Sequence, residues 1–128
     1  CYWMVRNHPH QMVFFNSLAG NNLQNKFELD YWGLSIKNAL ENILKYDDRE
    51  NIKVIGMSRT RLNFTLFLLN EDEKNRIEIV KNVNEADYII SIFNSTTRRK
   101  DFMNLGYKII NDIKVDDVII NSTFKVLD

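Results

Sequence analysis

The chain has 128 residues, enough for one domain that buries roughly two thirds of its unfolded surface. Its 17 Lys and Arg residues balance 17 Asp and Glu residues, so the net charge is zero. Because there is no excess positive field, we expect no nucleic-acid partner. No window of the sequence approaches the ~20 consecutive apolar residues that cross a bilayer, so we expect this segment itself to be soluble.

The amino-terminal segment is aromatic and begins with Cys1 rather than Met, so we expect a piece of a longer or processed chain. Cys1 is the single cysteine and cannot form an internal disulfide. Tyr2 and Trp3 form the kind of aromatic pair that lies at a membrane interface just after a spanning helix. A short apolar segment packed on the domain explains the pair equally well. We interpret residues 1–16 as a membrane-proximal lead-in and residues 17–128 as one soluble domain.

The folded part is predicted to begin after Pro9, which cannot lie inside a helix. The short apolar run Met12–Phe15 fits a buried strand or an extended lead-in, and a polar loop follows it. The stretch Phe27–Gly33 is dense in acids and aromatics. It precedes a helix predicted over residues 34–46, where apolar residues recur every three or four positions.

Either Asp30 or Ser35 is predicted to cap that helix, with a side-chain oxygen that accepts a free backbone N–H. The elements predicted beyond it are, in chain order, a strand over 52–56, a helix from Ser58 to about Leu69, a polar loop over 71–75, a strand over 76–80, a strand over 87–93, an exposed helix over 95–105 that ends before Gly106, and two strands over 108–113 and 118–126.

The second helix is open to another interpretation, because the leucines and phenylalanine over residues 62–68 also alternate as in a strand. The run over 87–93 is almost continuously apolar, which is typical of a strand covered on both faces, so we predict it at the sheet centre. The last two strands form a closing hairpin around Asp116 and Asp117. We therefore predict a single small α/β domain, with α+β as the alternative: a mixed sheet with two or three packed helices and a C-terminal β-hairpin.

Two residue pairs are candidates for chemistry. His8 and His10 are the only histidines, too few for a zinc site that needs three or four protein ligands, so we predict no metal site. Glu28 and Asp30 point to one face of an extended segment and are placed for acid–base work. Helix capping by Asp30 is the competing interpretation. Catalytic templates such as a phosphate-binding glycine loop or a nucleophile elbow are absent from the sequence, and we expect no cofactor.

Two stretches resemble a known family. The stretch from His8 to Asn16 resembles the "HPyQyvyfN" lead-in, and the stretch from Phe27 to Ser35 resembles the "fElDYWGlSykea" signature. Both belong to the C-terminal extracytoplasmic region of multi-spanning bacterial glycosyltransferases that use polyprenyl-phosphate sugars and are related to the dolichyl-phosphate-mannose protein mannosyltransferases. Residues 86–90 are similar to that region's "aDYvI" strand, and the hairpin over 106–126 is similar in layout to its end. The chain departs from the family in two loops, where it has the single Gly20 and the pair at 116–117.

The resemblance implies an accessory domain on the extracytoplasmic face of a bacterial membrane. Its partners would be the membrane portion of the same chain and, through it, a lipid-linked sugar or a glycan acceptor. In that family the catalytic acids lie in the membrane portion, so the resemblance implies no catalytic residue here. The candidate substrate-binding residues are Glu28, Asp30, Tyr31, Trp32, His8, His10 and Asn16, and Pro9, Gly33 and Ser35 are structural parts of the two motifs.

Two other functions remain open. Tyr31 and Trp32 present flat aromatic faces that stack on sugar rings, which favours a carbohydrate-binding module. A self-contained hydrolase that uses Glu28 and Asp30 is the third hypothesis. Two carboxylates one residue apart rarely flank a substrate from opposite sides, as glycoside hydrolysis requires, so this hypothesis ranks last.

Overall fold

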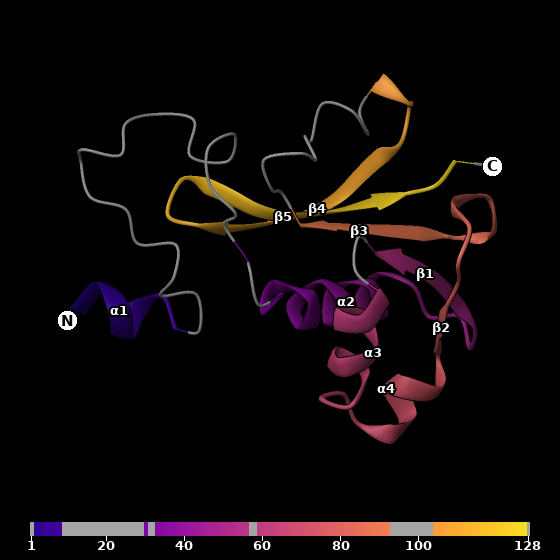
Figure 1. The fold of residues 1–128 in the computed structure, drawn as a ribbon, viewed down its shortest axis with the longest axis horizontal. Helices are drawn as coiled ribbons and strands as arrows, with labels where there is room; N and C mark the ends of the chain where they lie inside the picture. The colour runs from indigo at the N-terminus through magenta and orange to yellow at the C-terminus, as the bar shows by residue number, and fades with distance from the viewer. Residues whose placement is uncertain (1, 9–29, 31–32, 57–58, 93–103, 128) are drawn as a thin grey trace.

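The computed structural model describes residues 2–8, 30, 33–56, 59–92 and 104–127, and Figure 1 shows their arrangement. Five strands form one mixed sheet in the order β2-β1-β3-β5-β4. The strands are β1 (Ile52–Gly56), β2 (Ile77–Ile79), β3 (Tyr88–Ile92), β4 (Lys108–Val115) and β5 (Val118–Lys125). The first three strands are parallel, whereas β5 is antiparallel to both β3 and β4. The predicted fold class, a single small α/β domain with a C-terminal hairpin, is confirmed.

The described helices are α1 (Tyr2–Arg6), α2 (Ser35–Tyr46), α3 (Arg59–Leu66) and α4 (Glu71–Asn75), with a short 3-10 helix, η4 (Val83–Glu85). Helix α2 lies along one face of the sheet, with α3 beside it (Figure 1). The prediction of α2 is confirmed. The segment after β1 is helical rather than extended, and its helix ends at Leu66, three residues earlier than predicted.

The polar loop predicted over residues 71–75 is wrong, because this segment forms α4. The side chain of Asn70 accepts a hydrogen bond from the backbone N–H of Glu73, and the Glu73 carboxylate accepts one from the N–H of Asn70. This reciprocal capping box satisfies two free N–H groups at the start of the helix. Helix α4 has no buried residue, so apolar periodicity gave no sign of it.

Other predicted elements lie wholly or largely outside the described residues: the apolar run over 12–15 and the helix over 95–105. Gly106, which was predicted to follow that helix, has φ +83, a conformation that favours glycine. The predicted hairpin is confirmed. Its turn contains Asp116 at φ 51, and asparagine and aspartate tolerate this left-handed region better than most residues do.

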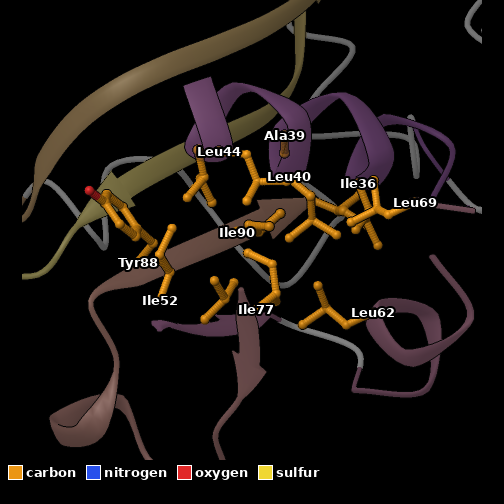
Figure 2. Close-up of a cluster of buried hydrophobic side chains, with 13 residues drawn as sticks. Ile36, Ala39, Leu40, Leu44, Ile52, Leu62, Leu69, Ile77, Tyr88 and Ile90 are labelled. Atoms are coloured by element: carbon orange, nitrogen blue, oxygen red, sulfur yellow. The ribbon is translucent and has the colours of Figure 1, made fainter. Parts of the chain in front are cut away.

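The main core lies between α2 and the sheet (Figure 2). The apolar stripe of α2 is buried against side chains from β1, β2 and β3, including Ile52, Val54, Ile77, Tyr88 and Ile90. Every residue of β3 is buried, as expected for a strand at the centre of the sheet. Burial of a leucine or isoleucine side chain contributes about 1.5–3 kcal/mol, so this layer dominates the stability of the fold.

Helix α1 contacts the turn end of the hairpin. Trp3 packs against a small apolar cluster formed by Val115 and Ile120, and its indole Nε1 donates a hydrogen bond to the Asp116 carboxylate at 2.6 Å. Tyr2 is 81% exposed. Of the two interpretations of the aromatic pair, packing on the domain therefore describes Trp3.

Candidate functional site

The signature stretch is anchored by Asp30, which is only 4% exposed. Its Oδ1 accepts a hydrogen bond from the backbone N–H of Leu34 at 2.9 Å. Its Oδ2 accepts two, from the backbone N–H and the side-chain hydroxyl of Ser35, at 2.9 and 2.5 Å. A carboxylate at this position satisfies free N–H groups and interacts favourably with the positive end of the helix dipole.

Asp30 therefore performs the predicted capping of α2. The alternative prediction, Ser35 as the cap, is wrong. Ser35 is the first helical residue, and its hydroxyl donates to Asp30 instead of accepting from the backbone. The residue at the N-cap position is Leu34, whose side chain makes no capping hydrogen bond.

Ser35 also connects the start of α2 to the sheet. The side-chain amide of Asn121 in β5 donates to the Ser35 hydroxyl at 2.7 Å. Asn121 is fully buried and lies opposite Ile92, the last residue of β3. This series of hydrogen bonds, from Asn121 to Ser35 to Asp30, thus fixes the amino end of α2 at the carboxyl end of β3.

Gly33 closes the stretch. Its φ is +70, and its backbone N–H donates to the Asp30 carbonyl at 3.0 Å. A Cβ at this position would lie 2.9 Å from Ile36 Cδ1 and 3.1 Å from Arg61 Cδ. Only glycine adopts this positive φ and also leaves room for Ile36 and Arg61 without strain, so the predicted structural role of Gly33 has a physical basis.

The structure describes few of the other candidate residues. His8 lies exposed just after α1. Glu28, Tyr31, Trp32, His10, Asn16 and Pro9 lie outside the described residues, so their roles stay predictions. Within the described part of the chain, no group of three or more metal-ligating side chains comes together.

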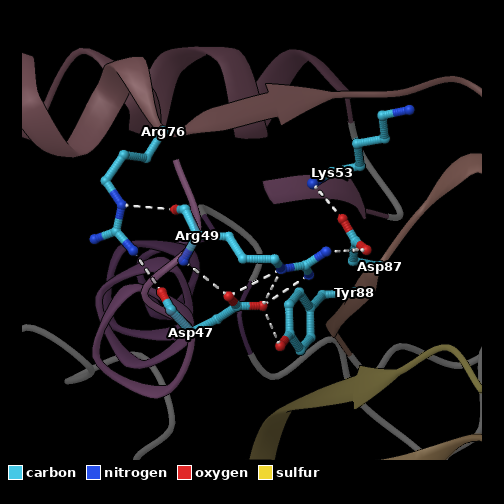
Figure 3. Close-up of polar contacts among 6 residues, drawn as sticks. All are labelled: Asp47, Arg49, Lys53, Arg76, Asp87 and Tyr88. Carbon is cyan, nitrogen blue, oxygen red and sulfur yellow. Dashed lines mark hydrogen bonds and ion pairs between the residues drawn. The ribbon is translucent and has the colours of Figure 1, made fainter. Parts of the chain in front are cut away.

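A second polar cluster, which the sequence did not indicate, lies at the other end of α2 (Figure 3). Asp47 follows the last residue of α2, and its carboxylate accepts hydrogen bonds from Arg49 Nη2 at 2.7 Å, from Arg49 Nε and from the Tyr88 hydroxyl at 2.8 Å. Arg49 Nη1 also donates to Asp87 at 3.0 Å. The other Asp87 oxygen accepts from the backbone N–H of Lys53 at 2.8 Å.

Arg76 fixes the backbone beneath this cluster. Its Nε donates to the carbonyl of Arg49 at 3.0 Å, and its Nη2 donates to the carbonyl of Asp47 at 2.5 Å. The segment between α2 and β1 is therefore held by side chains from α4's end and from β3's start.

The charges of the cluster stabilise one another. Hydrogen bonds from Arg49 hold the pKa of the Asp47 carboxyl well below its usual range, against the opposing effect of burial, and the Tyr88 hydroxyl lowers it further. Burial and the neighbouring Asp47 carboxylate raise the pKa of the Tyr88 hydroxyl. Hydrogen bonds to Asp47 and Asp87 raise the pKa of the Arg49 guanidinium. All three groups keep their ordinary neutral-pH charge states in the folded protein.

The cluster borders a cavity of about 440 Å³ at the amino ends of β1 and β3. Its walls are formed by Tyr46, Asp47, Asp48, Arg49, Ala86, Asp87, Tyr88, Lys125 and Val126. In the sequence, residues 47–51 indicated only the end of a helix. Arg49 and Asp87 are separated by 38 positions, so no local pattern pairs them.

Comparison with protein-family models, curated proteins and solved structures found no match for this chain. Every helix in the described ranges is too short or too polar to cross a membrane.

Proposed function

We propose that this chain is an accessory domain of a membrane-bound bacterial glycosyltransferase, without catalytic activity of its own, that shapes the donor or acceptor site or braces the membrane portion. The resemblance of residues 8–16 and 27–35 to two motifs of that enzyme family suggests this role. The observation that carries the non-catalytic part is the engagement of Asp30. Both of its carboxylate oxygens accept hydrogen bonds from the start of α2.

The same observation weighs against a self-contained hydrolase. A catalytic carboxylate must reach its substrate and exchange a proton with it. Asp30 is buried and its three donors come from the protein, so its proton exchange would disrupt the start of α2.

The position of α1 supports a membrane-proximal orientation in this proposal. Trp3 contacts the hairpin turn, and the hairpin extends past the carboxyl end of β3, where Asn121 contacts the start of α2. Figure 1 draws α1, the hairpin turn and the start of α2 at the same end of the sheet. A membrane portion that precedes α1 would thus lie on the side of the signature stretch, and the domain itself would lie on the extracytoplasmic face of the membrane.

The test compares the 128-residue chain with its intact parent in a sugar-transfer assay. We expect the chain by itself to transfer no sugar, and the parent to carry apolar segments of about 20 residues before Cys1. A double change of Tyr31→Ala and Trp32→Ala in the parent is expected to reduce transfer about 10- to 100-fold, because misplacement near a reaction centre has effects of that size.

The control is Val83→Ala in the parent, since Val83 is an exposed apolar residue of η4, 36% accessible, just before the amino end of β3 and so at the opposite end of the sheet from the start of α2. This control should keep full transfer activity. A parent whose upstream region is soluble, or one whose transfer is unaffected by the double change, contradicts the proposal. Turnover by the isolated chain would make it an enzyme in its own right.

A further inference from the structure

The cavity beside Asp47 adjoins a second hollow. This hollow has a volume of about 280 Å³ and is lined by Asn42, Lys45, Tyr46, Ile110 and Asn111. Tyr46, the last residue of α2, contributes to the walls of both, so the two hollows share this residue. Tyr46 is 56% exposed, which leaves much of its ring available for contact.

The charge of the larger cavity restricts its ligand. Its three carboxylates, from Asp47, Asp48 and Asp87, outnumber its two cations, from Arg49 and Lys125, which leaves one net negative charge. Arg49 is already paired with two of the carboxylates. An anionic ligand would therefore meet more repulsion than attraction, and a cationic ligand would have to compete with Arg49 for Asp47 and Asp87. A purely apolar ligand is also disfavoured, because five of the nine lining residues are charged.

The remaining hydrogen-bonding groups suit a neutral ligand with many hydroxyls. A guanidinium has five N–H donors, and Arg49 uses three of its side-chain donors on Asp47 and Asp87, so two remain on a side chain that is 51% exposed. In the second hollow, Asn111 has a buried Nδ2 without a hydrogen-bond partner. A buried donor without a partner is costly, so it gains a partner if the Asn111 amide turns toward a ligand hydroxyl in the hollow.

The groups of the cluster are already held by hydrogen bonds before any ligand binds. Arg49 donates to the Asp47 carboxylate through two nitrogens, and the Tyr88 hydroxyl donates to the same carboxylate. Arg76 donates to the two backbone carbonyls of Asp47 and Arg49. Groups that are already ordered lose little conformational entropy on binding. Fixed polar donors and acceptors beside an exposed aromatic face are the combination that recognises sugar rings.

We propose that the two hollows that share Tyr46 form one groove for a neutral oligosaccharide of at least two rings, with Tyr46 stacked on one ring. Arg49 donates to hydroxyls in the larger cavity, and Asn111 donates to a hydroxyl in the smaller one. The groove lies at the end of α2 opposite Asp30, and its existence does not depend on the accessory role proposed above.

The experiment is an NMR titration of the 128-residue chain, labelled with nitrogen-15, against neutral hexose disaccharides at about 10 mM, where a millimolar Kd gives saturable shifts. The expected result is saturable shifts of the backbone amides of Tyr46, Asp48 and Asn111. Inorganic phosphate and 1,4-diaminobutane are titrated as anionic and cationic probes. If either probe shifts these amides while the disaccharides do not, the proposal is overturned.

Two variants and one control sharpen the test. Tyr46→Ala is expected to weaken disaccharide binding about tenfold, the effect of one lost aromatic contact. Asn111→Leu is expected to weaken binding without loss of thermal stability, since its buried donor has no partner in the free protein. Tyr2→Ala removes an exposed tyrosine from α1 and should leave binding unchanged.

Equal disaccharide affinity in the Tyr46→Ala variant and the unaltered chain would overturn the proposal, as would the absence of shifts with every disaccharide. Neither result bears on the transfer assay of the parent, so the groove and the accessory role fail independently.

Discussion

Asp30 and Gly33 act together at the start of α2, and their roles are separable. Asp30 supplies acceptors to the first N–H groups of the helix and to the Ser35 hydroxyl. Gly33 supplies a left-handed backbone conformation and close contact with Ile36 and Arg61. A carboxylate can cap from four residues upstream only because the backbone bends at Gly33.

Gly33→Ala is expected to lower the free energy of unfolding by about 2–4 kcal/mol, the combined effect of left-handed strain and of overlap with packed side chains. Urea unfolding of the 128-residue chain measures the change. Gly106→Ala is the matched control, because Gly106 has a similar φ of +83 but no atom within 4 Å of the new Cβ. The control should lose only about 1 kcal/mol, from backbone strain. Equal losses in the two variants would show that packing around Gly33 contributes nothing.

Residue patterns predicted the cap but not its partners. An acid shortly before an apolar helix indicates capping, and Asp30 confirms this. Asn121 of β5, which donates a hydrogen bond to the Ser35 hydroxyl, lies 86 positions from Ser35 in the sequence. Their contact depends on β5 lying next to β3, and the strand order is not encoded in any local pattern.

At the scale of elements, α2 is fixed at both ends. Asp30 holds its first turn, and the Asp47 cluster holds its last residue against the starts of β1 and β3. With 12 residues, α2 is about 18 Å long, so the two polar clusters lie at opposite ends of the domain core.

The Asp47 cluster should make stability depend on pH. The pKa of Asp47 is lower in the folded protein than in the unfolded chain, so the unfolded chain binds more protons between the two values. The stability that Asp47 contributes is complete above the unfolded pKa of about 4 and is lost as the pH falls toward the folded value. The advantage of the unaltered chain over Asp47→Asn should therefore be constant near neutral pH and shrink below about pH 4.

Urea unfolding at several pH values measures this difference. Asp48→Asn is the control, since Asp48 is an exposed neighbour and its replacement removes the same formal charge without touching the cluster. A difference between Asp47→Asn and the unaltered chain that stays the same at every pH would contradict the prediction.

Elements with strong apolar patterns were predictable. The apolar stripe of α2 reflects burial of one face of the helix, and the continuous apolar run of β3 reflects burial of both faces of the strand. Helix α4 was missed because its five residues bury nothing and only the capping box at Asn70 and Glu73 marks it. In α3 the alternating leucines and phenylalanine favoured a strand as well as a helix, and tertiary packing of Leu62 on the core decides for the helix.

At the scale of the whole molecule, the two proposed sites lie at opposite ends of the sheet. The signature stretch, the hairpin turn and α1 lie at one end, and the groove beside Tyr46 lies at the other. The two proposals therefore concern separate surfaces, and variants at one end should not perturb the other.

The contact between α1 and the hairpin connects the lead-in to the domain, and it includes the hydrogen bond from Trp3 to Asp116. Asp116→Gly removes the acceptor of the Trp3 indole, whereas glycine accommodates the φ of 51 at this turn. The hairpin is therefore expected to persist while α1 loses its docking. The measurement is solvent exchange of the Trp3 indole N–H by NMR, which should become faster in the variant. Asp117→Ala, at the neighbouring exposed position, should leave the exchange rate unchanged. Slow exchange in Asp116→Gly would mean that the other contacts of Trp3, including those with Val115 and Ile120, hold α1 on the hairpin without the hydrogen bond to Asp116.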